Sequence, residues 1–252
     1  SLVGLTREQI ASFHWAPEKQ IPVIRTFVDK AIAEAMALRA KIPDLANSDD
    51  VGEKRRLLHD ADDALAKVRM VGDAVVPSFF SEGKAKAREE VRQRWETKTQ
   101  TWLSGQDTSG DVAAFAAELR EGERPVPCFH WEVEFPEVFS GRTPGFDAFV
   151  GNPPFLGSVG LAESTRSGYT NWLRLAAPGS GGKTDIVAFF FRRAFDLVRQ
   201  GGLLGLLSTK TIRQGDTRRS GLQEIRKAGG IIVSAVRRIV WPGKASVVVS
   251  AV

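Results

Sequence analysis

The residues with the clearest chemical potential are Asn152, Pro153, Pro154 and Phe155, which follow one another in the chain. The two prolines fix backbone φ angles and remove two N–H donors, so the groups left to interact are acceptors. The Asn152 side-chain oxygen and the Pro153 carbonyl oxygen could together accept both hydrogens of an exocyclic amine. They would orient the amine's lone pair toward an electrophile and stabilise the positive charge that develops on the nitrogen. Phe155 offers a flat face on which a planar ring can stack.

The residues around this motif must position it, and their pattern indicates an α/β sheet. Residues 146–151 form an apolar strand candidate, in which Asp147 is more easily read as a polar strand residue than as a catalytic acid. A Pro-Pro turn can also end a strand without any catalytic role. Beyond it, helices and strands alternate, as in a sheet with crossover helices. We expect a helix over 186–200 capped by Asp185, a strand over 203–207, a helix over 217–228, and strands over 231–236 and 246–252.

The first 122 residues have a different pattern, which predicts helices. Apolar side chains recur at helical intervals, and Asp50 precedes one periodic run as a candidate N-cap. Farther along, residues 129–135 alternate apolar and polar side chains, which predicts a strand. Residues 152–184 are rich in Gly, Ser and Thr and long for a connector, so we expect a functional loop there. The expected helices cover 21–41, 54–70, 81–103 and 111–120.

The composition excludes several classes of protein. The chain has 252 residues, of which 42% are hydrophobic and 26% charged, as in ordinary globular proteins. It has no apolar run of membrane-spanning length and no secretory signal pattern, so we expect no membrane partner and a cytoplasmic location. Cys128 is the single cysteine, which excludes an internal disulfide. Three scattered His residues with one Cys predict no metal site.

Positive charge is concentrated in the last part of the chain. Residues 151–252 carry 15 basic and 5 acidic side chains, a net charge of +10, which indicates either an anionic partner, nucleic acid first, or a merely solvated basic face. Residues 179–184 read Gly-Ser-Gly-Gly-Lys-Thr, but Ala177 stands where a phosphate-binding loop needs Gly, so a mobile loop near nucleic acid is the better interpretation. The candidate phosphate contacts are Lys183 in this loop and Lys210, Arg213, Arg218 and Arg219 after the 203–207 strand, the last two at a helix N-terminus.

The motif is the one shared by amino-methyltransferases that use S-adenosylmethionine. Its surroundings resemble the large bacterial adenine-N6 DNA methyltransferases of restriction-modification and phage-defence systems, including type IIG-like enzymes. The resemblance covers residues 129–252 well and 1–122 weakly. The segments that carry it are Trp131–Phe139, Gly145–Asp147, Gly151–Phe155, Lys183–Ile186 with its Phe-rich helix, Gly201–Gly202 and Trp241–Val247.

The resemblance implies a Rossmann-like methyltransferase sheet of strand order 3-2-1-4-5-7-6, of which the four expected strands would be the fourth to the seventh. The activity implied is methyl transfer from S-adenosylmethionine to adenine N6 of double-stranded DNA after base flipping. Asn152 and the Pro153 carbonyl would hold the amine, and Phe155 would stack on the adenine. Asp185 and Phe189 are the candidate cofactor contacts, although a helix cap is the first interpretation of Asp185 and core packing is the stronger interpretation of Phe189.

The chain departs from the family in lacking a Gly-rich cofactor loop and an acidic residue after an upstream strand. We therefore expect a helical insertion segment at 1–122 and the C-terminal half of a catalytic domain at 123–252. Such a chain would need the missing N-terminal half to bind cofactor and methylate, and its fourth strand would be an open edge. Two alternatives stay open: a methyltransferase acting on RNA bases or protein glutamine, and a non-catalytic DNA-binding module.

Overall fold

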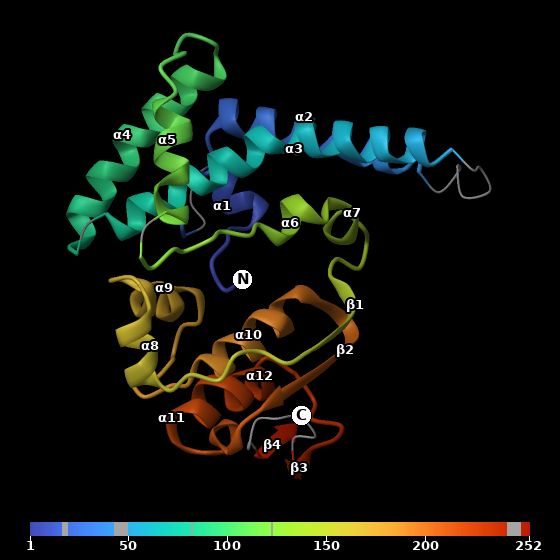
Figure 1. Cartoon of the computed structure of the whole chain (residues 1–252), viewed down its shortest axis with the longest axis vertical. Coiled ribbons are helices and arrows are strands. Elements are labelled where there is room, and N and C mark those ends of the chain that lie inside the picture. The colour runs from blue at the N-terminus through green and yellow to red at the C-terminus, as the bar shows by residue number, and fades with distance from the viewer. Residues whose placement is uncertain (17–19, 43–49, 82, 122, 241–247) are drawn as a thin grey trace. The chain divides into compact units, whose positions relative to one another are not determined.

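The computed structural model describes residues 1–16, 20–42, 50–81, 83–121, 123–240 and 248–252. The chain divides into two compact units (Figure 1): one comprises Ser1 and Val3–Phe139, and the other comprises Leu2 and Ser140–Val252. The expected division after residue 122 into an insertion and a catalytic half stays a prediction. The Trp241–Val247 segment of the family resemblance lies outside the described residues.

The first unit is helical. The predicted helices at 21–41, 81–103 and 111–120 are confirmed with small shifts of their ends, and the 54–70 helix continues to Phe80 because residues 71–79 are all buried. The Asp50 side chain accepts the Glu53 N–H at 2.9 Å, which confirms the expected cap. The helices are α1 Arg7–Ala11, α2 Pro22–Arg39, α3 Val51–Phe80, α4 Ala85–Leu103, α5 Asp111–Ala117, the 3-10 helix η2 Glu118–Arg120, α6 Trp131–Glu134 and α7 Pro136–Phe139.

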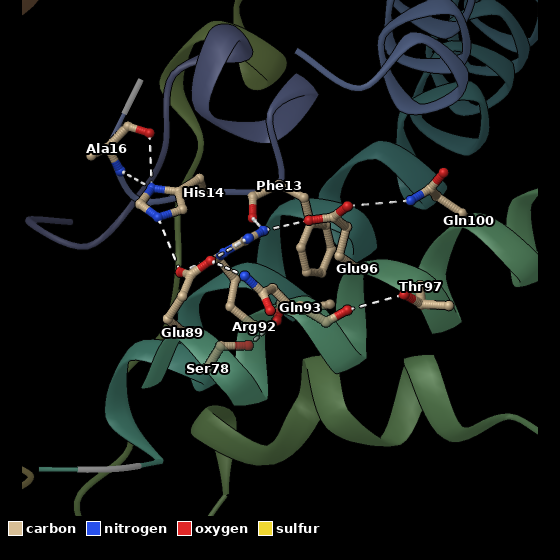
Figure 2. A network of polar contacts seen from close by, with 11 residues as sticks. Phe13, His14, Ala16, Ser78, Glu89, Arg92, Gln93, Glu96, Thr97 and Gln100 are labelled. Carbon is tan, nitrogen blue, oxygen red and sulfur yellow. Dashed lines mark hydrogen bonds and ion pairs between the residues drawn. The ribbon is translucent and has the colours of Figure 1, made fainter. Parts of the chain in front are cut away.

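The charged helix α4 joins this unit through a buried arginine. Figure 2 shows the Arg92 guanidinium surrounded by acceptors: it donates to Glu89 at 2.6 and 2.9 Å, to Glu96 at 2.6 Å and to the Phe13 carbonyl at 3.1 Å. The His14 ring lies 3.4 Å from the same Glu89 carboxylate. Because the arginine is paired on all sides, its burial is compensated.

The predicted strand at 129–135 is wrong, since residues 131–134 form the short helix α6. The alternation of apolar and polar residues does not mark a strand here, because the polar side chains form hydrogen bonds and ion pairs inside the unit instead of facing water. Buried His130 accepts the Leu5 N–H at 3.0 Å, Glu132 accepts the Arg7 N–H at 2.8 Å, and Glu134 binds Arg69 through two bonds of 2.7 and 2.9 Å. Period-2 spacing predicts a strand only where one set of side chains is solvated.

The second unit is α/β, as predicted. Its long 152–184 connection contains two helices, and the expectation that this connection is functional stays a prediction. The expected strand at 231–236 is displaced to 236–240, and residues 231–235 have no regular structure. The elements are β1 Phe146–Gly151, α8 Ser158–Ser164, α9 Tyr169–Ala176, α10 Ile186–Leu197, β2 Val198–Ser208, the 3-10 helix η3 Lys210–Arg213, α11 Gly215–Arg218, the π-helix η4 Arg219–Gln223, α12 Glu224–Lys227, β3 Val236–Val240 and β4 Val248–Ala251.

Helix α10 ends earlier than expected, and Gly201 and Gly202 lie inside β2 instead of ending the helix. A Cβ on Gly202 would lie 2.5 Å from a Val198 methyl carbon and 2.8 Å from the Asp147 carbonyl oxygen. This glycine therefore permits a close approach of β1 to β2 at the irregularity in their register. Two glycines after an apolar helical run are also typical of a helix stop, and spacing alone does not distinguish the two uses.

The four strands form one mixed sheet in the order β1-β2-β4-β3. β1 and β2 are parallel, whereas β4 is antiparallel to both of its neighbours. The order agrees with that expected for the four strands, while their numbering within a methyltransferase sheet stays a prediction. β1 lies at one end of the sheet, where Val150 is 84% exposed. Helix α10 lies against β2 (Figure 1), and the core between them contains Val187, Phe191 and Leu206.

Candidate active site

The Asn-Pro-Pro-Phe segment begins directly where β1 ends. Residues 152–157 have no regular secondary structure and lead into α8. The Asn152 side chain is exposed and, within the described part of the chain, forms no hydrogen bond. Pro153 is buried and Pro154 exposed, while Phe155 is half-buried and packs against the hydrophobic core under α10. The motif thus presents a free amide beside a ring that is partly covered.

Asp185 lies at the centre of the hydrogen bonds around this segment. Its side chain accepts the Val187 N–H at 3.1 Å, which confirms the predicted cap of α10. The same oxygen accepts the Leu156 N–H at 3.3 Å, directly after Phe155. The other carboxylate oxygen accepts the Thr211 hydroxyl at 3.3 Å. Three segments therefore meet at one buried carboxylate.

The glycine-rich loop at 179–184 is held by side chains of the helical stretch that begins at Gly215. The Gly181 N–H donates to the Ser220 hydroxyl and the Lys183 N–H to the Asp216 carboxylate, each at 3.0 Å. Thr184 lies 2.7 Å from Ser220, oxygen to oxygen. Because these two backbone donors already have partners, they are not free to bind a phosphate, and the loop is anchored by several bonds.

The candidate phosphate contacts lie on three successive elements after β2, which are η3, α11 and η4, and on the anchored loop. Lys210 and Arg213 are exposed on η3 and Arg218 is exposed at the end of α11, none of them in an ion pair within the described residues. Arg219 forms an ion pair with Asp216, the residue that also accepts the Lys183 N–H, and this pairing lowers the pKa of the Asp216 carboxyl.

The expected position of Arg218 and Arg219 at a helix N-terminus is wrong. The helical stretch begins at Gly215, so both lie near the end of the first turn or beyond it. Asp216 occupies the first turn, where a negative charge is favourable. The start was misplaced because Gly215 was not recognised as a helical residue.

The two candidate cofactor contacts do not present free groups. Phe189 is only 7% exposed and belongs to the buried side of α10, and both oxygens of Asp185 already accept hydrogen bonds. The role of these two residues as contacts for S-adenosylmethionine stays a prediction. Among the described residues, no group of three His, Cys, Asp or Glu side chains could hold a metal ion.

The sequence reasoning missed the side chains that anchor the site. Thr217 accepts the Asp185 N–H at 3.0 Å, and Thr211, Asp216 and Ser220 hold the contacts described above. The sequence contains a signal for them. Asp216, Thr217 and Ser220 are short polar residues, which are unfavourable inside a helix, and their spacing places them on one helical face.

The sequence comparison decides the family. Residues 54–228 match the model of the Eco57I restriction-modification methylase, which is more than half of the 252 residues. The chain belongs to the Eco57I restriction-modification methylase family. The match to the Eco57I methylase model spans the Asn-Pro-Pro-Phe segment, Asp185 and all five candidate phosphate contacts. It confirms the resemblance to methyltransferases of restriction-modification systems. No curated protein sequence matches the chain.

Among the helices that the structure describes, none combines the length and apolar composition that a membrane crossing needs.

Proposed function

We propose that this chain supplies the target-base half of a DNA methyltransferase that modifies adenine N6 in restriction-modification or phage defence. S-adenosylmethionine would supply the methyl group, with its main contacts made by residues outside this chain. The single observation that carries the proposal is the Asn152 amide, which is exposed and unbonded within the described residues at the carboxyl end of a parallel strand. In open α/β sheets, ligands bind at this edge.

The chain's own residues would act by holding the target amine. The Asn152 side-chain oxygen and the Pro153 carbonyl would accept the two N6 hydrogens of a flipped adenine, which directs the nitrogen lone pair outward. As the nitrogen gains positive charge, both acceptors bind its hydrogens more strongly, so the stabilisation is greatest in the transition state. The half-buried Phe155 would provide a fixed edge or face against which the base is held.

Double-stranded DNA is the partner that the charge distribution supports. Residues 151–252 carry the net charge of +10, and Lys210, Arg213 and Arg218 are exposed near the carboxyl end of β2. Exposed cations without ion pairs can bind phosphates without first breaking an internal contact. Binding through them should be strongly salt-dependent.

The test is methyl transfer by the complete protein that contains this chain. We expect transfer of labelled methyl from S-adenosylmethionine to duplex DNA, with N6-methyladenine identified by mass spectrometry of the digested product. Asn152→Ala should abolish transfer without changing the unfolding of the protein, because the side chain forms no internal bond. Asn171→Ala, at an exposed position on α9 of the same unit, is the matched control and should retain activity. Undiminished turnover by Asn152→Ala, or methyl transfer to RNA or protein instead of DNA, would refute the proposal.

A further inference from the structure

We propose that Asp185 is a positioning residue, which holds the Asn-Pro-Pro-Phe segment in place through the backbone of Leu156. This inference rests on the proposed function, because it gives a role to a residue that would not itself touch the base. It differs from the expected role of Asp185 as a cofactor contact.

The segment is fixed at both of its ends. At its start, Gly151 is in register with Leu206 of β2, in the parallel pair. At its end, Leu156 forms two hydrogen bonds with the beginning of α10: its N–H donates to Asp185 at 3.3 Å, and its carbonyl accepts the Ile186 N–H at 3.0 Å. Between these two anchors lie only the four residues of the motif, two of which are prolines with fixed φ angles.

Asp185 is itself held firmly enough to act as an anchor. It is 6% exposed, its N–H donates to the Thr217 hydroxyl, and its second carboxylate oxygen accepts the Thr211 hydroxyl. Thr211 lies in the 3-10 helix after β2, so the carboxylate connects the segments that follow the two parallel strands. Removing this one side chain would take a hydrogen bond from each of the two loops at the edge where the base is expected.

The chain allows variants that separate this role from helix capping. Asp185→Ser keeps a good N-cap for α10 but is too short to reach Leu156 and Thr211 as well. Asp185→Asn keeps an acceptor for the N–H groups of Leu156 and Val187 and places a donor near the Thr211 hydroxyl. This variant should therefore retain the positioning of the Asn-Pro-Pro-Phe segment. Asp50→Ala removes an equivalent Asp cap from α3 and serves as the control for a cap loss outside the site.

The first measurement is amide hydrogen exchange of the 252-residue chain, read on peptides that cover 152–157. Asp185→Ser should speed exchange there by about tenfold, as expected for the loss of one hydrogen bond. Asp185→Asn and Asp50→Ala should leave these peptides unchanged. Exchange that is unaltered in Asp185→Ser would overturn the proposal, whatever the enzyme does.

The second measurement is steady-state DNA methylation by the complete protein. Asp185→Ser should lower kcat by about 10- to 100-fold, as a displaced catalytic group does, while KM for DNA and for S-adenosylmethionine changes little. Asp185→Asn should retain most of kcat. A raised KM for S-adenosylmethionine with unchanged kcat would overturn the positioning role in favour of cofactor contact. If Asn152→Ala is inactive but Asp185→Ser is fully active, only the positioning role fails. If Asn152→Ala is active, the proposed function and this inference both fail.

Discussion

Replacing Ser220 by alanine tests whether the 179–184 loop is anchored by the helix that follows β2. Ser220 is 1% exposed, and its hydroxyl accepts the Gly181 N–H and contacts the Thr184 hydroxyl. Thr184 keeps a second bond, to the Gly181 carbonyl at 2.9 Å, so the substitution leaves one backbone donor without its partner. A buried unsatisfied donor costs about 1–3 kcal/mol, and Gly181 is half-buried, so we expect a loss of about 1–2 kcal/mol.

The assay must report on the second unit alone, because a chain of two compact units need not unfold in one transition. Urea-dependent hydrogen exchange, read on peptides from 179–228, meets this need. Ser164→Ala is the matched control: its hydroxyl donates to the Gly160 carbonyl at 2.6 Å on an exposed helix, where removal should cost less than about 0.5 kcal/mol. Equal losses in the two variants, or faster exchange everywhere except 179–185, would refute the anchoring argument.

Two further predictions concern the first unit. Gly72→Ala should destabilise it by about 1–3 kcal/mol, although Gly→Ala inside a helix usually stabilises, because the new Cβ would lie 2.6 Å from the buried ring of His130. Thermal unfolding measures this loss, and the double variant with His130→Ala should lose less stability than the two single variants lose together. Burial and the nearby Asp73 carboxylate raise the pKa of the Cys128 thiol. At pH 8, iodoacetamide should therefore alkylate the native chain at least about tenfold more slowly than the urea-unfolded chain. Equal alkylation rates would contradict this environment of Cys128.

Much of the fold could be predicted because local patterns and tertiary environment agree. The apolar runs of β1 and β2 are buried or paired as their composition suggests, and Asp50 and Asp185 cap the helices that follow them. The order of the four strands was also correct, but it came from the family resemblance, since spacing alone does not choose among sheet topologies.

The errors arise where a local pattern has two physical explanations. At 129–135, the polar side chains His130, Glu132 and Glu134 are satisfied by residues 57 to 125 positions away, which no local period reveals. At Gly202, the need for glycine comes from the approach of another strand. For the candidate site, the motif was identified from its residues, whereas the hydrogen bonds that hold Leu156 to Asp185 depend on the fold that brings them together.

The position of β4 has a consequence for synthesis on the ribosome. β4 lies between β2 and β3, and within the described residues it is the strand on which β3 pairs. Until residues 248–251 have emerged from the exit tunnel, β3 lacks the only strand on which it pairs within the described residues. Its Val236 and Val240 side chains, which are 53% and 75% exposed even in the four-stranded sheet, then have less cover still. A nascent chain that stalls shortly before β4 would therefore expose an incomplete sheet to chaperones and proteases, so correct folding of this unit depends on translation passing that point.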